Sequence, residues 1–351
     1  MWKDKRVLVT GHTGFKGTWL CALLLRMGAR VSGYALPPDP ETQSLFPASE
    51  LDMKMDSRLG DLSDRDSLKA CFEDLKPQFV FHLAAQSLVR ASYVDPLATF
   101  QTNVMGTANL LEACRTSPGL QGIVVVTSDK CYENRNWLFP YRETDRLGGH
   151  DPYSASKACT ELVVSSYRDS FLAEAGVPTA SARAGNVIGG GDFAADRLVP
   201  DAIRAFRDGH SLEIRSPHAT RPWQHVLDPL AGYVRLGEEL LSGNPQAIGA
   251  FNFGPDGEAT VETVVQKIID HWGSGADYHT PGPQDIPHEA SRLHVASDKA
   301  KSLLKWNPRW PLEESVGRTT RFYKRWLSGE KALRLLEEDI SEYLGSSRVT
   351  A

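Results

Sequence analysis

The sequence predicts an α/β fold, with a doubly wound parallel sheet followed by a smaller C-terminal lobe. Short apolar runs alternate with segments of helical period through the first half of the chain, which is typical of parallel β-α-β units. A glycine-rich turn separates the first apolar run from the first helical segment. Beyond about residue 186, helices are joined by short strands and proline-rich loops. We therefore expect a Rossmann domain over residues 1–185, to which parts of the later chain return, a smaller lobe over 186–335 and a charged tail over 336–351.

The first strand, residues 6–10, leads into a glycine turn and then a helix with apolar residues from Trp19 to Met27. Strand, glycine turn and helix in this order form the context of a dinucleotide site, because the backbone can approach a pyrophosphate at a positive helix N-terminus. The spacing is one residue longer than G-x-G-x-x-G. The residues expected to contact the cofactor here are Gly11, His12, Gly14, Phe15, Lys16 and Gly17. For Lys16, a phosphate contact and a solvated surface position are both open.

The second strand, residues 30–36, ends without the acid that would hold the ribose hydroxyls of NAD, and without an arginine for NADP. The residues themselves therefore leave the choice between NAD and NADP open. A short third strand is expected at 59–62, where Asp61 and Leu62 are candidate cofactor contacts. A turn or capping role for Asp61 is an equal alternative. A helix over 64–75 follows.

The fourth strand, 79–83, runs into small residues, so that Leu83, Ala84 and Ala85 allow close approach of a cofactor. A helix over 98–116 and a fifth strand over 121–127 complete the alternation. Ligands of such sheets bind at the carboxyl ends of the strands. Ser128 directly follows the fifth strand, at such an end.

Tyr153 and Lys157 are four residues apart in a helix expected over 153–171, so they share one face. A nearby ammonium favours the phenolate and should lower the pKa of the phenol. With Ser128 to orient a sugar hydroxyl, these groups could remove a proton from an alcohol while a hydride leaves its carbon. A tyrosine and a lysine four residues apart also occur commonly on surface helices. The catalytic interpretation therefore depends on the cofactor site predicted at the upstream glycine turn.

The later chain contains a sixth strand at 180–183 and helices near 198–208, 228–242, 260–273 and 313–328. We expect this smaller lobe to close over the substrate. The last helix and the acidic stretch Glu337-Glu338-Asp339 are expected to be peripheral.

Composition excludes several classes of protein. The chain has 351 residues, 41% hydrophobic and 24% charged, which is ordinary for a globular protein. Its net charge is −5 without a long basic run, so nucleic acid is not an expected partner. No apolar stretch reaches the ~20 residues that span a bilayer, so no membrane association is expected. The five cysteines are widely spaced, form no metal-type pair and are expected to be reduced thiols of a cytoplasmic protein.

Taken together, the glycine turn, Leu83-Ala84-Ala85, Ser128 and the Tyr153–Lys157 pair resemble the extended short-chain dehydrogenase/reductase family, specifically its enzymes that modify nucleotide sugars. The resemblance covers nearly the whole chain. Four segments are similar to the branch of the family that dehydrates CDP-glucose: Gly-His-Thr-Gly-Phe-Lys-Gly (11–17), His-Leu-Ala-Ala-Gln (82–86), Thr-Ser-Asp-Lys-Cys-Tyr-Glu-Asn (127–134) and Arg-Pro-Trp-Gln-His-Val (221–226).

This resemblance implies a lyase that binds NAD, acts on CDP-glucose, feeds deoxysugar and lipopolysaccharide biosynthesis, and forms a homodimer. Ser128, Tyr153 and Lys157 would oxidise C4, after which the C5 hydrogen lies alpha to a ketone. Lys130 would remove that hydrogen and Asp129 would protonate the departing C6 hydroxyl. Related dTDP-glucose dehydratases have a glutamate where this chain has Lys130. A structural ion pair of Lys130 with Asp129 or Glu133 is the alternative.

Positive and amide side chains are expected to hold the substrate, since arginine suits phosphate. The candidates for substrate binding are Gln86, Asn186, Arg197, Arg215, Arg221 and His288. Three other functions remain open at this point: a nucleotide-sugar 4-epimerase, a dehydratase of another nucleotide-glucose, and a non-catalytic NAD(P)-binding regulator.

Overall fold

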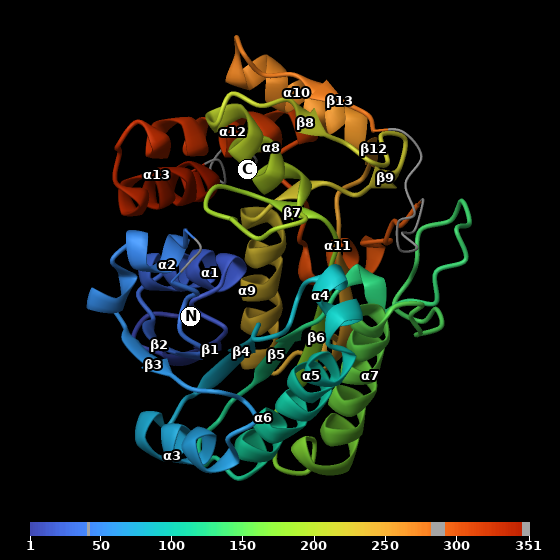
Figure 1. Cartoon of the computed structure of the whole chain (residues 1–351). Helices are drawn as coiled ribbons and strands as arrows, with labels where there is room; N and C mark the ends of the chain where they lie inside the picture. The colour runs from blue at the N-terminus through green and yellow to red at the C-terminus, as the bar shows by residue number, and fades with distance from the viewer. Residues whose placement is uncertain (41–42, 282–291, 346–351) are drawn as a thin grey trace.

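The computed structural model describes residues 1–40, 43–281 and 292–345. Its centre is a seven-stranded sheet in which every neighbouring pair is parallel (Figure 1). In spatial order the strands are β11 (Gly249–Phe253), β6 (Thr179–Ala184), β5 (Ile123–Val126), β4 (Phe79–His82), β1 (Arg6–Thr10), β2 (Arg30–Ala35) and β3 (Asp56–Leu59). This is the doubly wound order with one added strand, and it confirms the predicted fold class.

The strand order reverses between β1 and β4, which lie side by side with Thr10 opposite His82. Crevices for ligands open at such a point, beyond the carboxyl ends of the two strands. A buried hydrogen bond of 2.7 Å joins Thr10 Oγ1 to His82 Nδ1, and a second bond joins His82 Nε2 to Thr107 Oγ1. These bonds fix the strand ends from which the glycine turn and the Leu83-Ala84-Ala85 segment start.

Two apolar clusters cover the two faces of the sheet. One face packs against α1 (Phe15–Arg26), α9 (Leu227–Leu241) and α11 (Asp298–Leu304), and α13 (Ala332–Gly345) joins the same cluster by packing on α1. The other packs against α3 (Arg65–Leu75), α6 (Gly106–Arg115) and α7 (Pro152–Tyr167). Strand residues alternate between these clusters, as Leu8 and Val9 do, which is why the parallel strands are apolar on both sides.

A third apolar cluster forms a layer beyond the carboxyl edge of the sheet (Figure 1). Its helices are α8 (Leu198–Arg207), α10 (Val261–Trp272) and α12 (Leu312–Leu327). Short strand pairs join them: β7 (Val187–Ile188) with β10 (Gln224–His225), β9 (Thr220–Arg221) with β12 (Ala259–Thr260), and β8 (Leu212–Glu213) with β13 (Tyr278–His279). Because β11 lies in the main sheet, the chain returns there after residue 186. The lobe boundary at 185 stays a prediction.

Helical segments also run along one side of the molecule next to α7. They are α4 (Val89–Val94), α5 (Pro96–Phe100), a π-helical turn (Gln101–Met105) that continues into α6, and a π-helical turn (Arg168–Leu172) that ends α7. Smaller elements are α2 (Leu45–Ala48) and 3-10 turns at Leu51–Met53, Asp129–Cys131 and Pro245–Ala247. Across the described ranges, no helix combines the length and apolar character that a membrane span requires.

Three sequence expectations about elements were wrong. The helix near 313–328, expected to be peripheral, is α12, and its Val316, Phe322 and Tyr323 are buried. The third strand is Asp56–Leu59, so Asp61 and Leu62 follow it. Residues 332–345 form helix α13, whose Leu335, Leu336 and Ile340 are buried in the largest apolar cluster. The stretch expected to be a peripheral charged tail is therefore, up to residue 345, part of the core.

Candidate active site

The glycine turn fits a closely approaching phosphate group. Gly11 has a φ of +74°, and a Cβ placed there would lie 2.7 Å from the backbone nitrogen of Ala84. A Cβ on Gly17 would lie only 2.0 Å from the Gly11 carbonyl oxygen. Gly14 precedes the first turn of α1, where free backbone N–H groups and the helix dipole favour an anion. This cradle has the form that a dinucleotide pyrophosphate requires.

Other predicted cofactor residues have structural partners. His12 is buried, its Nε2 lies 2.8 Å from Ser57 Oγ, and burial lowers its pKa to about 4. Asp61 accepts a hydrogen bond from the Ser63 backbone at 2.8 Å, which is the turn role left open by the sequence. Leu62 packs in the apolar cluster beneath α3 and α6. Any cofactor contact of these three residues must use their remaining atoms.

At the end of β5, Ser128 and Asp129 are both buried. Ser128 Oγ donates to Asp129 Oδ1 at 3.1 Å and accepts from the Lys130 backbone at 3.2 Å. Asp129 Oδ2 is buried and has no hydrogen-bond partner among the described residues. Burial raises the pKa of Asp129, although the charge of Lys130 opposes the rise. The carboxyl group is thereby suited to hold a proton.

Helix α7 starts with Asp151 as its N-cap, which accepts from the Ser154 backbone at 2.9 Å, and with Pro152 in its first turn. This start places Tyr153 and Lys157 on the buried face. Burial raises the pKa of Tyr153 to about 12, opposed by the hydrogen-bonding Ser128 hydroxyl. Burial also lowers the pKa of Lys157 to about 8. The expected lowering of the phenol pKa by Lys157 is therefore wrong for the protein alone, because burial dominates at both groups.

Lys16 lies closer to these groups than its place in the glycine turn suggested. Its positive charge acts to lower the pKa of Lys157 and to oppose the rise in the pKa of Asp129. Burial lowers the pKa of Lys16 to about 8, and Arg197 adds to the lowering. Arg197 in turn donates to Asp192 Oδ2 at 2.8 Å and to Ser87 Oγ at 3.0 Å. A positive group thus lies between the glycine turn and the proposed catalytic residues.

Lys130 is half-buried. Glu133, one of the two alternative partners, pairs instead with Arg135 and Arg146. Within the described ranges no ion pair joins Lys130 to Asp129 either, although the two charges interact. The structural ion pair considered from the sequence is therefore not formed.

The predicted substrate residues differ in how they are held. The Gln86 amide donates to Leu88 and Thr99, so it closes a turn. Asn186 is half-buried beside the short β7–β10 pair, and its carbonyl accepts from Gln224 at 3.1 Å. Arg221 is buried in β9, and its charge acts on Asp129.

Arg215 lies 3.6 Å from Asp196, at a surface-facing ion pair. His288 lies outside the described residues. Among the described arginines predicted to bind substrate, Arg221 acts on the pKa of Asp129 and Arg197 on that of Tyr153.

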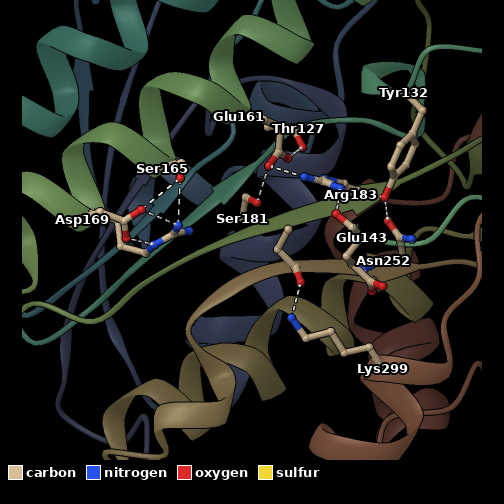
Figure 2. Close-up of polar contacts among 12 residues, drawn as sticks. Thr127, Tyr132, Glu143, Glu161, Ser165, Asp169, Ser181, Arg183, Asn252 and Lys299 are labelled. Carbon is tan, nitrogen blue, oxygen red and sulfur yellow. Dashed lines mark hydrogen bonds and ion pairs between the residues drawn. The ribbon is translucent and has the colours of Figure 1, made fainter. Parts of the chain in front are cut away.

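Sequence reasoning missed a buried ion pair behind the site. Arg183 of β6 donates to Glu161 of α7 at 2.8 Å, and both side chains are 4% exposed (Figure 2). A signal was present: Glu161 is one turn beyond Lys157, and Arg183 interrupts a strand made otherwise of small, uncharged residues. A charge in a buried strand requires a partner.

Comparison with known proteins gives consistent relatives. The family model described as GDP-mannose 4,6 dehydratase matches residues 8–319. The CDP-glucose 4,6-dehydratase of Salmonella typhimurium is 46% identical over 99% of this chain and 98% of its own length. The UDP-glucose 4-epimerase of Mycolicibacterium smegmatis is 28% identical over 91% of this chain and 98% of its own. Among solved structures, the Thermus thermophilus UDP-glucose 4-epimerase complex with NAD is similar in fold, with a TM-score of 0.78 at 24% identity, covering 91% of this chain and 98% of that one.

Proposed function

Because the chain belongs to the GDP-mannose 4,6 dehydratase family, we propose that it converts CDP-D-glucose to CDP-4-dehydro-6-deoxy-D-glucose and water, with NAD as cofactor. The full-length similarity to the Salmonella CDP-glucose 4,6-dehydratase supports this substrate. The observation that carries the proposal is the buried, unpartnered Oδ2 of Asp129 beside Ser128 and Tyr153. An acid at that place is what elimination of water requires, and an epimerase has no use for it.

Gly11, Gly14 and Gly17 would hold the NAD pyrophosphate, because a side chain at Gly11 or Gly17 would collide with backbone. Lys157 would hold the nicotinamide ribose, since no hydrogen bond occupies its ammonium in the described part of the chain. When bound, NAD supplies the acceptor and later donor of hydride, and a positive nicotinamide charge that favours the ionised phenol.

Tyr153 is the proposed base for the C4 hydroxyl proton. Its phenol is buried next to Ser128, whose hydroxyl can hold the same sugar hydroxyl in line. Lys157 lies one helical turn away and stabilises the phenolate by its charge. Exclusion of water strengthens these interactions, so the burial that raises the phenol pKa in the protein alone also magnifies the effect of each nearby positive charge.

Asp129 and Lys130 are proposed to carry out the elimination. Lys130 takes the C5 proton, and Asp129, whose pKa is raised by burial, gives its proton to the departing C6 hydroxyl. Two adjacent residues in a tight turn after β5 can face the C5–C6 bond of one hexose. Arg221, Arg197 and Asn186 are the proposed contacts of the diphosphate, with Gln86 and Arg215 nearer the edge of the site.

We further propose a homodimer through the side formed by α4, α5 and α7. Large apolar side chains are exposed along it: Val94, Leu97, Met105, Leu162 and Phe171. Leu97 and Met105 line one hollow of this side together with Val104 and Cys159, and exposed apolar surface of this kind marks an interface. In Figure 1, α4, α5, α6 and α7 lie side by side at one flank of the sheet.

The cytoplasm is the proposed compartment, where the five free cysteines stay reduced and sugar nucleotides are available for deoxysugar and lipopolysaccharide synthesis.

The test is incubation of the protein with NAD and a panel of CDP-, dTDP-, UDP- and GDP-sugars, followed by mass spectrometry. The proposal expects a product lighter than CDP-glucose by one water, and slower or no conversion of the other nucleotides. A product of unchanged mass would identify an epimerase. Faster conversion of another nucleotide-glucose, with loss of water, would support the proposed reaction and contradict CDP-glucose as the substrate.

A further inference from the structure

A single buried ion pair holds residues on both sides of the proposed catalytic turn. Glu161 Oε1 accepts from Thr127 Oγ1 at 2.5 Å, and Oε2 accepts from Ser181 Oγ at 2.7 Å and Arg183 Nη2 at 2.8 Å (Figure 2). Burial alone would raise the pKa of Glu161, but Arg183 and these hydroxyls hold it below its usual value. Glu161 is therefore a charged, fully engaged group inside the fold.

The other end of the turn is held by Arg183. Its Nη1 donates to the Tyr132 hydroxyl at 2.7 Å, and its guanidinium lies 5.0 Å from the centre of the Tyr132 ring. The Tyr132 hydroxyl in turn donates to Asn252 Oδ1 of β11 at 2.7 Å. Thr127 immediately precedes Ser128, and Tyr132 is two residues beyond Lys130. Both ends of the segment that carries the proposed acid and base are thus tied to one ion pair.

The same pair is connected to the helix that carries the phenol. Glu161 lies one turn after Lys157 and two turns after Tyr153 on α7. Asn252 extends the network further, because its side-chain amide donates to the carbonyls of Tyr141 and Ala296. The contacts therefore cross α7, β5, β6 and β11, which come from distant parts of the chain.

A buried ion pair is weak evidence for stability, since apolar side chains of similar volume often stabilise as well or better. What it adds is fixed geometry. We propose, on the premise of the function above, that Glu161, Arg183 and the Tyr132 hydroxyl are positioning residues that hold the Ser128–Lys130 turn against Tyr153. C4 oxidation and elimination across C5–C6 can then take place on a single placement of the sugar. None of the three needs to touch the substrate.

The stacked pair Tyr132 and Tyr141 offers a matched test. Their rings are 5.2 Å apart at an interplanar angle of 17°, and both are buried in the same small apolar cluster. The Tyr141 hydroxyl, however, accepts from the Arg135 backbone and donates to Asn134, away from Arg183. Tyr132→Phe and Tyr141→Phe therefore remove the same atom from one stack, and only the first removes a hydrogen bond to Arg183.

With CDP-glucose, we expect Tyr132→Phe to lower kcat about tenfold or more, because small displacements of catalytic groups are costly. The KM for CDP-glucose should stay within about twofold, since the substrate contacts are unchanged. Elimination should slow more than oxidation, so reduced nicotinamide should accumulate and C5 solvent exchange should fall. Tyr141→Phe should keep kcat within about twofold of wild type, even if its Tm falls equally.

Two further measurements do not depend on turnover of Tyr132→Phe. In the protein without ligand, hydrogen–deuterium exchange of residues 127–132 should be faster in Tyr132→Phe than in Tyr141→Phe. Thr127→Val should lower kcat in the same way, and Thr127→Ser, which keeps the hydroxyl, should restore it. If Tyr132→Phe does not fold, the Thr127 pair decides the matter.

The outcomes separate the two proposals. A wild-type protein that releases no water from any nucleotide-glucose overturns the function, and the positioning role with it. An active wild type whose Tyr132→Phe and Tyr141→Phe variants lose equal activity, or whose Thr127→Val variant is fully active, overturns the positioning role alone.

Discussion

In the proposed mechanism, Asp129 is the residue at which dehydration and epimerisation separate. Its Oδ2 is buried and unpartnered in the described part of the chain, and Gly185 leaves room for it, since a Cβ there would lie 2.3 Å from that oxygen. Asp129→Asn keeps the shape and removes the acid. We expect dehydration to slow about 10²- to 10⁴-fold, the usual contribution of a general acid, while C4 oxidation persists. The absorbance of reduced nicotinamide after rapid mixing measures C4 oxidation, and the mass of the product measures dehydration.

Equal loss of both steps in Asp129→Asn would contradict this assignment. It would indicate that Asp129 supports Ser128, to which it is hydrogen-bonded, and that the acid is another group. Recovery of dehydration with a substrate whose C6 leaving group needs no proton, such as a 6-fluoro analogue, would support the acid role directly.

Lys16 gives a prediction about pH. Burial raises the pKa of Asp129 and lowers that of Lys157, and the positive charge of Lys16 acts to lower both. The proposed mechanism needs Asp129 protonated and Lys157 charged, so we expect activity to fall as the pH rises through their pKa values. Lys16→Gln removes the lowering at both groups, and the alkaline limb of the kcat profile should therefore move to higher pH. Lys16→Arg keeps its charge above about pH 8, where Lys16 itself loses its proton, so the limb should stay at or slightly below its wild-type position.

The kcat profile of Lys16→Gln could instead keep the wild-type alkaline limb, with only the affinity for NAD reduced. That result would contradict the pH effect and support the phosphate contact considered from the sequence. The profile must be measured at saturating NAD, because the glycine turn also contributes to cofactor binding.

The residues that could be predicted from sequence are those in contiguous motifs. The glycine turn, Ser128-Asp129-Lys130 and Tyr153 with Lys157 each lie within a few residues of a strand end or a helix start. The partners that hold them, Glu161 and Arg183, are 22 residues apart and meet only when α7 packs on β6. The local sequence indicates that a buried charge needs a partner, but it does not show which distant residue that partner is.

Among elements, prediction succeeded where apolar period was strong and failed where charge obscured it. β3 is an edge strand of sequence Asp-Ser-Arg-Leu with little burial, so its pattern is weaker than that of the more apolar Leu59–Leu62, which the sequence predicts as a strand. In α13, Leu335, Leu336, Ile340 and Tyr343 do recur at helical spacing. The acidic run between Leu336 and Ile340 is typical of an exposed segment. The other face of the helix is buried, and there the Tyr343 hydroxyl donates to buried Asp228 at 2.8 Å.

The β1–α1 turn supports a prediction at the level of the element. Gly17→Ala would place a methyl group 2.0 Å from a backbone oxygen, and backbone cannot move aside as a flexible side chain can. We expect a stability loss of about 1–3 kcal/mol and more than tenfold weaker binding of NAD, since the start of α1 must shift. Gly257→Ala, where the methyl group would meet nothing within 4 Å, is the control. Calorimetric titration with NAD and thermal unfolding measure the two effects.

An unchanged NAD affinity in Gly17→Ala would show that the cradle does not bind the pyrophosphate, whatever happens to stability. A loss of stability alone would leave the turn a purely structural feature.

At the scale of the molecule, the two proposals give α7 a function on each of two opposite faces. Its inner face carries Tyr153, Lys157 and Glu161, all buried. Its outer face exposes Leu162, beside exposed Leu97 and Met105 of the neighbouring helical segments. A second copy packed on this side would support the helix that holds the phenol, so that assembly and catalysis depend on the same element.

Substitution of Leu97 tests this arrangement. Leu97 is 80% exposed in a single chain, and Met53, on the far side of the sheet, is 82% exposed. Leu97→Asp would bury a charge in the proposed interface, and we expect dimer affinity to fall by about 100-fold or more, because an unpaired buried charge costs several kcal/mol. Met53→Asp should change nothing. Sedimentation velocity should then show the 38.7 kDa chain as a monomer for Leu97→Asp, with kcat reduced in proportion to the dissociated fraction.

A Leu97→Asp variant that sediments as wild type would place the interface elsewhere, and a fully active monomer would show that α7 holds Tyr153 without help from a partner.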